Sequence, residues 1–180
     1  MQEVTYVQRS LNKEEGLRFY PLEGLLPVDQ ALSVNTTYMV VSLIARNSAN
    51  GNPIIWQTLL TEPQMRLLLP LLQSPLYCSH HILYASLSCS YRGLLAGLFC
   101  YDSTTTKEWA ATLEESRVRM RHAHELGTSK RELKHVYNTL SQLRTKLCSF
   151  GLAITVSITE SAYTLVPLRF PHYDVNIHDV

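Results

Sequence analysis

One stretch, residues 128–166, constrains the fold of this chain most, because two different periodicities follow one another in it. Apolar residues first recur at spacings of three and four, which predicts a helix with one apolar face. These residues are Leu133, Val136, Tyr137, Leu140, Leu143 and Leu147. Two β-rich runs, 153–158 and 162–166, follow with three polar residues between them, which predicts a β-hairpin directly after the helix.

Local signals predict where this helix begins and ends. Ser129 and Glu132 have the S-x-x-E spacing of a capping box, in which the two side chains satisfy free N–H groups of the first turn. Gly151 follows as a stop signal, and Lys146 places a positive charge near the negative end of the helix dipole. We therefore expect one helix over residues 129–147.

The polar face of this helix carries cationic and amide side chains, which suit a nucleic acid. Lysine and arginine bind guanine edges or phosphates, and asparagine and glutamine bind adenine edges. The candidate DNA-binding residues are Lys130, Arg131, Lys134, His135, Asn138, Gln142, Arg144 and Lys146. Arg144 ranks below the others, because its angular position lies near the edge of the apolar face. A cationic helix followed at once by a hairpin is typical of winged-helix proteins, in which the helix enters a major groove.

The order of residues in this region resembles the end of an OmpR/PhoB-type winged helix-turn-helix domain. That family shows L-R-x-K-L, a short loop with glycine, a T-V strand and a G-Y-R-L ending. Here the matching residues are LRTKL at 143–147, Gly151, the run 154–156 and AYTL at 162–165. The resemblance implies sequence-specific binding to double-stranded DNA, with the helix at about 129–147 as the recognition helix.

The preceding residues continue the resemblance. Residues 60–64 (LTEPQ) are similar to the family's L-T-x-x-E helix start, and Thr61 with Gln64 can form a capping box. An apolar stripe follows, but Pro70 predicts that this helix bends or ends near Leu69, because proline removes a hydrogen bond and clashes with the preceding turn. Ser79 then predicts a second helix to about Leu87, which corresponds to the family's positioning helix.

The resemblance also implies an antiparallel sheet before the first helix. Strands are predicted at 37–45 and 54–59, since both runs are rich in β-branched and aromatic residues. A turn containing Asn50-Gly51 joins them. We expect an α+β fold: a winged helix-turn-helix domain at 35–168, preceded by an N-terminal arm or extra strand at 1–34 and followed by a tail at 169–180.

Residues 88–127 interrupt the family pattern before the recognition helix. Thr105 and Glu108 have the spacing of a capping box, which predicts a helix to about Glu125 inside this insert. The first half of the insert is apolar. Exposed apolar surface on a small domain favours association, so we expect a homo-oligomer, a dimer or higher, in which the insert forms the subunit contact.

Charge is distributed unevenly along the chain. The formal net charge is only +1, yet residues 117–146 contain eight basic and two acidic side chains. A local cationic stripe on a near-neutral protein indicates an anionic partner. No signal peptide or membrane-spanning run is predicted, and the four cysteines show no disulfide framework or metal-ligand spacing. The sequence therefore predicts a cytoplasmic protein without a metal or cofactor, and no catalytic motif indicates an enzyme.

Two functions agree with these patterns. The first is a transcriptional regulator that binds double-stranded DNA. A receiver domain does not fit beside this domain in 180 residues, so control would come from oligomerisation, a regulatory protein partner or expression level. The alternative is a degenerate winged-helix module that binds proteins and has lost DNA binding. The near-neutral charge and the acidic Glu160 between the two hairpin strands favour this alternative.

Overall fold

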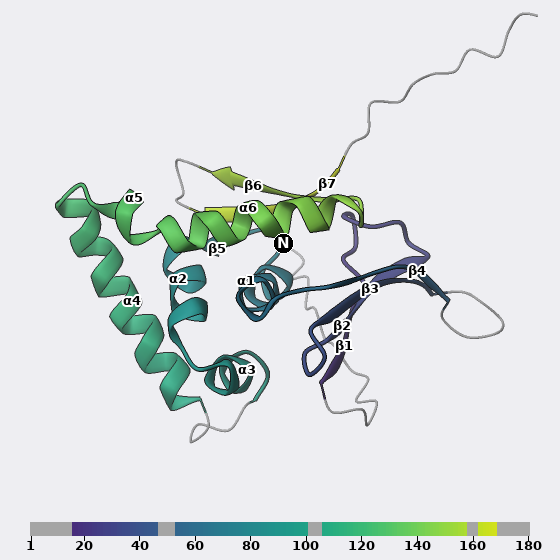
Figure 1. Ribbon diagram of the computed structural model, residues 1–180, viewed down its shortest axis with the longest axis horizontal. Coiled ribbons are helices and arrows are strands. Elements are labelled where there is room, and N and C mark those ends of the chain that lie inside the picture. Colours follow the sequence, from purple (N-terminus) through teal and green to yellow (C-terminus); the bar gives the residue numbers. More distant parts are fainter. Residues whose placement is uncertain (1–15, 47–52, 101–105, 158–161, 169–180) are drawn as a thin grey trace, which may run out of the picture.

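The computed structural model describes residues 16–46, 53–100, 106–157 and 162–168, which form a mixed α+β fold (Figure 1). Four strands come first, six helices and a short strand follow, and a hairpin closes the described part. Helix α1 (Glu62–Gln73) lies at the centre, with a four-stranded sheet on one side and helices on the other. None of the described helices has the length and apolar character that crossing a membrane requires.

The first sheet is antiparallel throughout, in the order β1-β2-β3-β4. Its strands are β1 (Leu17–Tyr20), β2 (Gln30–Asn35), β3 (Val40–Ala45) and β4 (Ile54–Leu59). The two predicted strands are present as β3 and β4, although β3 begins three residues later than expected. Residues 1–34 were expected to supply an arm or one extra strand, and their described part supplies β1 and β2 instead. Alternate side chains of β2 and β3, among them Leu32 and Val41, face the core.

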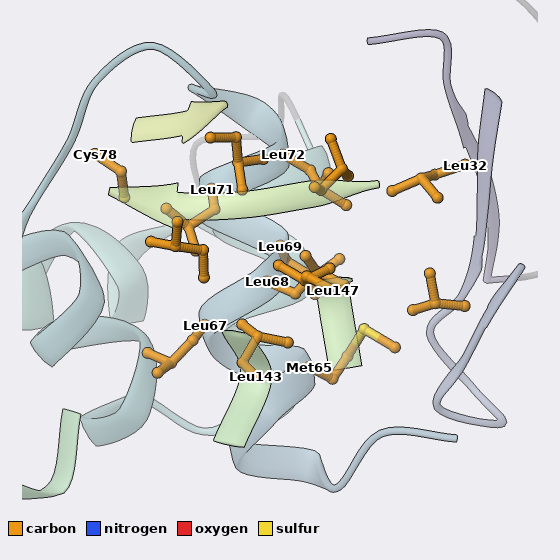
Figure 2. Close-up of a cluster of buried hydrophobic side chains, with 14 of the residues drawn as sticks. Leu32, Met65, Leu67, Leu68, Leu69, Leu71, Leu72, Cys78, Leu143 and Leu147 are labelled. Atoms are coloured by element: carbon orange, nitrogen blue, oxygen red, sulfur yellow. The ribbon is translucent and has the colours of Figure 1, made fainter. Parts of the chain in front are cut away.

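Helix α1 is buried on almost every side. Its N-terminus follows the predicted capping pattern, because the Thr61 N–H donates to Gln64 Oε1 at 3.0 Å. The helix was predicted to bend or end near Leu69. The predicted end is wrong, because α1 continues through a buried Pro70 to Gln73. Eight of its residues are buried: Gln64, Met65, Leu67, Leu68, Leu69, Pro70, Leu71 and Leu72. In Figure 2, Met65 points toward the sheet that carries Leu32, whereas Leu67 and Leu71 point away from it.

Helices α2 (His80–Ser88) and α3 (Tyr91–Phe99) cover the side of α1 that faces away from the first sheet, and α4 (Lys107–Glu125) packs outside them. Helix α2 has Ser79 at its N-cap position, as predicted. The helix predicted within the insert is therefore confirmed as α4.

The insert is integrated into the fold rather than attached to its surface. The Tyr91 hydroxyl donates to the Thr36 carbonyl at 2.8 Å, and the Arg18 guanidinium lies 3.5 Å from the centroid of the Phe99 ring. These contacts join α3 to the four-stranded sheet. The apolar side chains Leu94 and Trp109 are buried within the chain, which removes much of the reason for expecting the insert to form a subunit contact.

The last elements are a short helix, a long helix and a hairpin. The helix predicted at 129–147 is divided into α5 (Ser129–Glu132) and α6 (Lys134–Cys148), which meet at the buried Leu133. Gly151, with φ of +71°, turns the chain into β6 (Leu152–Ser157), and β7 (Ala162–Pro167) returns antiparallel to it. The hairpin prediction is confirmed. Strand β5 (Cys78–Ser79) joins it in a second sheet of order β5-β7-β6.

Candidate nucleic-acid interface

Helix α6 has one buried and one exposed face. The side chains of Val136, Thr139, Leu140, Leu143 and Leu147 are buried against the core. The opposite side, called here the outer face, is formed by exposed residues at helical spacing: Lys134, His135, Asn138, Ser141 and Thr145. The amphipathic pattern read from the sequence therefore predicts the inward side of the helix correctly, except at Tyr137, which is 37% exposed.

Three of the predicted contact residues bind other parts of the chain. Arg144 Nε donates to the Ile154 carbonyl of β6 at 3.1 Å, and Lys146 Nζ donates to the Leu59 carbonyl at the end of β4. The side-chain oxygen of Gln142 accepts a hydrogen bond from Gln64 Nε2 at 3.3 Å. These bonds connect the C-terminal half of α6 to the hairpin, α1 and the first sheet, although Gln142 remains exposed.

Lys130 and Arg131 lie on α5, outside the helix to which the sequence assigned them. Both side chains are exposed. Glu132 was expected to take part in a capping box but instead pairs with Arg119 of α4. The Arg119 Nη2 and Nε atoms lie 2.8 and 2.9 Å from Glu132 Oε2. This ion pair connects α4 to the turn that precedes α6, so two exposed cations are displayed beside the start of the outer face.

An aromatic contact fixes the side of α6 that faces the second sheet. The His80 ring meets the Tyr163 ring edge-on at a centroid distance of 5.0 Å and the Tyr137 ring at 6.3 Å. Burial raises the pKa of Tyr163 to about 12. These ring contacts hold the N-terminus of α2 against the N-terminal half of α6 and against strand β7.

Two residues of the outer face were not among the predicted contact residues. Ser141 and Thr145 are exposed and follow Lys134 and Asn138 along the helix at spacings of three and four. Their angular position was the available signal, but their neutral hydroxyls did not mark them as contact residues. Serine and threonine can bind phosphates as well as bases, so both complete the polar stripe.

His81 of α2 lies near Arg117 of α4. Burial is the main cause that lowers the pKa of His81, and the nearby Arg117 guanidinium lowers it further. Arg117 itself pairs with Glu114 one turn earlier on α4, at 2.8 Å. Among the described residues, no three histidine, cysteine, aspartate or glutamate side chains gather as metal ligands would.

The comparisons with known proteins add no relative. No protein-family model matches this sequence, no curated protein matches it, and no solved structure matches it.

Proposed function

We propose that this protein binds double-stranded DNA and regulates transcription, with α6 as its recognition helix. The outer face of α6 carries the proposal, because it presents a cation, an imidazole, an amide and two hydroxyls to solvent along three turns. Side chains of these types hydrogen-bond base edges in a major groove, which is wide enough to admit one helix.

The order of elements supports a winged-helix arrangement. Helix α1, strand β5, helix α2, helix α6 and the β6-β7 hairpin follow one another, and β5 pairs with β7 beside that hairpin. Helices α3, α4 and α5 are then an insertion between the positioning and recognition helices. The OmpR/PhoB-type resemblance of the sequence agrees with this order, and the antiparallel sheet at the N-terminus agrees as well.

The proposed roles differ along the helix. Asn138, in the middle of the outer face, would hydrogen-bond a base edge, and Lys134 would bind a base edge or a phosphate near the helix start. Lys130 and Arg131 on α5 would bind backbone phosphates, which position a protein without reading sequence. Gln142, Arg144 and Lys146 would hold the helix in place through their contacts within the chain.

Selection from a random DNA pool, followed by mobility shift, tests the proposal. The double variant Lys134→Ala with Asn138→Ala should lose specific binding and keep the wild-type unfolding midpoint, because both side chains are exposed. Lys107→Ala, an exposed lysine at the far end of α4, is the matched control and should bind as the wild type does. Affinity should fall steeply between about 50 and 200 mM salt, because phosphate contacts release counterions. Unchanged affinity of the double variant for the selected site would reject α6 as the reading helix.

The alternative, a winged-helix module that binds proteins, is favoured by one observation. Three of the eight predicted contact side chains are occupied within the chain, which leaves a small cationic surface for DNA. DNA affinity that falls as salt rises would favour the DNA-binding function over the protein-binding module. A pool of random duplexes that gives no enriched site, with no mobility shift at low salt, would support the protein-binding module.

A further inference from the structure

Strand β4 forms one edge of the first sheet. Of the described strands, only β3 pairs with it. Its sequence IIWQTL contains no charge and no proline, although such residues commonly protect edge strands from association. Four of its six side chains are large and apolar, and Ile54, Ile55, Trp56 and Leu59 are each between 49% and 65% exposed. Apolar side chains gathered along an open edge favour the addition of another strand.

The backbone of β4 turns its hydrogen-bonding groups alternately to β3 and to the open edge. The Leu60 N–H donates to the Met39 carbonyl at 2.8 Å, so Leu60 faces the β3 side. Since the direction alternates along an antiparallel strand, Leu59 and Gln57 turn their N–H and C=O groups to the open edge. The Leu59 carbonyl accepts a hydrogen bond from Lys146 Nζ of α6, a contact from outside the sheet that agrees with this direction.

A second copy of the same strand complements this edge. When two identical strands pair antiparallel about a twofold axis, one residue lies opposite itself. Gln57 is suited to that position, because its edge-facing N–H and C=O groups can bond reciprocally to those of the second copy. The two side-chain amides then lie opposite each other, and each has both donors and an acceptor to offer. No like charges meet across the axis, since the strand carries no charge.

We propose that this chain forms a homodimer in which the β4 strands of two copies pair antiparallel, with Gln57 at the twofold axis. In this register Trp56 of each copy lies opposite Thr58 of the other, and aromatic with β-branched pairs stabilise neighbouring strands. Ile55 and Leu59 become cross-strand neighbours in the same way. The two four-stranded sheets join into one sheet of eight strands. The contact lies on the first sheet instead of the insert, and it is independent of DNA binding.

The exposed area predicts a weak dimer. Even at about 250 Å² for each side chain, the upper value for an aromatic residue, the four exposed side chains supply less than about 600 Å² per copy. Stable interfaces bury about 800 Å² per partner, and smaller ones belong to transient complexes. We therefore expect monomer and dimer to exchange reversibly between about 1 µM and 1 mM.

Sedimentation equilibrium of the full chain over about 1 µM to 1 mM tests the proposal. Gln57→Lys and Gln57→Glu each place two like charges opposite one another at the axis, and each should weaken dimerisation at least about tenfold. Gln57 is exposed, so neither variant should unfold the monomer. Mixing the two variants should restore association, because opposite charges then meet. The neutral control Gln57→Ser should dimerise within about twofold of the wild type.

Two results of this experiment would overturn the proposal. A chain that remains monomeric at the highest concentration has no self-association through β4, and another partner then covers the edge. A dimer whose dissociation constant is the same in Gln57→Lys and the wild type forms through a different surface.

Disulfide formation checks the register. Cys100→Ser with Cys148→Ser removes the two exposed thiols, and the other two cysteines are buried. In this background Gln57→Cys should crosslink two copies on mild oxidation, because residues of a hydrogen-bonded pair have Cα atoms about 5.5 Å apart, within disulfide range. Leu59→Cys on the same strand is the control, since its two copies lie four residues apart along the strands, roughly 14 Å. Equal crosslinking of the two variants would overturn the proposed pairing.

Discussion

Helices α1 and α6 lie in contact in the same core but have opposite surroundings. Helix α1 has 12 residues, eight of them buried, and elements surround it on almost every side. Helix α6 has 15 residues and keeps one polar face in solvent. The polar face of α6 was visible in the sequence and predicted its outward side correctly. The lack of such a face on α1 shows that it must be covered all round, but does not show which elements cover it.

The sharpest test of this contrast is a cavity on the helical side of α1. Leu67 is fully buried and points away from the first sheet. Leu67→Ala should reduce the free energy of unfolding by about 2–5 kcal/mol, through lost burial and the cavity left behind. Lys134→Ala on the outer face of α6 should stay within about 0.5 kcal/mol of the wild type. Urea denaturation followed by circular dichroism measures both, and similar small losses would mean that α2 and α3 do not cover α1.

A smaller loss is expected where α3 and α4 approach each other. A Cβ atom added at Gly97 would lie 2.1 Å from the Trp109 ring, so one of the two helices has to move. Gly97→Ala should cost about 1–3 kcal/mol, as overpacking does. Arg92→Ala, at an exposed position of the same helix, is the control. A Gly97→Ala protein as stable as the wild type would show that α4 packs loosely on this layer.

Acid should weaken the same layer through Glu108. Its carboxylate accepts hydrogen bonds from the Ser90 N–H at 2.9 Å and the Ser90 hydroxyl at 3.0 Å, and these bonds lower the pKa of Glu108. A lowered pKa in the folded state stabilises the protein above the ordinary carboxyl pKa. That contribution disappears as the pH falls through the lowered value. Melting temperatures between pH 7 and 3 should therefore fall less in Glu108→Gln than in the wild type, and parallel curves would contradict the assignment.

The smallest effect concerns the link between α4 and the start of α6. Arg119 pairs with Glu132 but is 53% exposed, so solvent screens the interaction. Arg119→Ala should cost at most about 1 kcal/mol, compared with no measurable change in the exposed Arg121→Ala. Thermal melts at low and high salt check this, because the Arg119 contribution should shrink with salt. A loss above about 2 kcal/mol would show that this ion pair does more than orient α5.

Much of the fold followed from local patterns. The hairpin and the amphipathic face of α6 were predicted because each pattern repeats over at least two turns or one full strand. The helix of the insert was predicted from the capping-box spacing of Thr105 and Glu108, of which Thr105 lies outside the described residues. Strand β2 was missed because its buried residues Leu32 and Val34 lie in a short polar segment. The predicted end of α1 near Leu69 was wrong because burial of Pro70 among leucines outweighs the lost hydrogen bond.

The candidate interface was only partly predictable. Sequence spacing identified Lys134 and Asn138 as exposed, and the structure agrees. It could not show that Lys146 reaches Leu59 or that Arg144 reaches Ile154, because those partners come from distant segments. Residues at the border of an amphipathic face are the ones whose partners depend on tertiary contacts.

The central position of α1 has a consequence during synthesis. Helix α1 leaves the ribosome before α2, α3 and α6, which cover it, and Cys148 at the end of α6 is made 75 residues after Gln73. At about 5–20 residues per second, its leucines would wait roughly 4–15 s for their last partner. A nascent chain of this protein therefore offers a leucine-rich segment to chaperones, and slow translation after residue 73 should lower the yield of native protein.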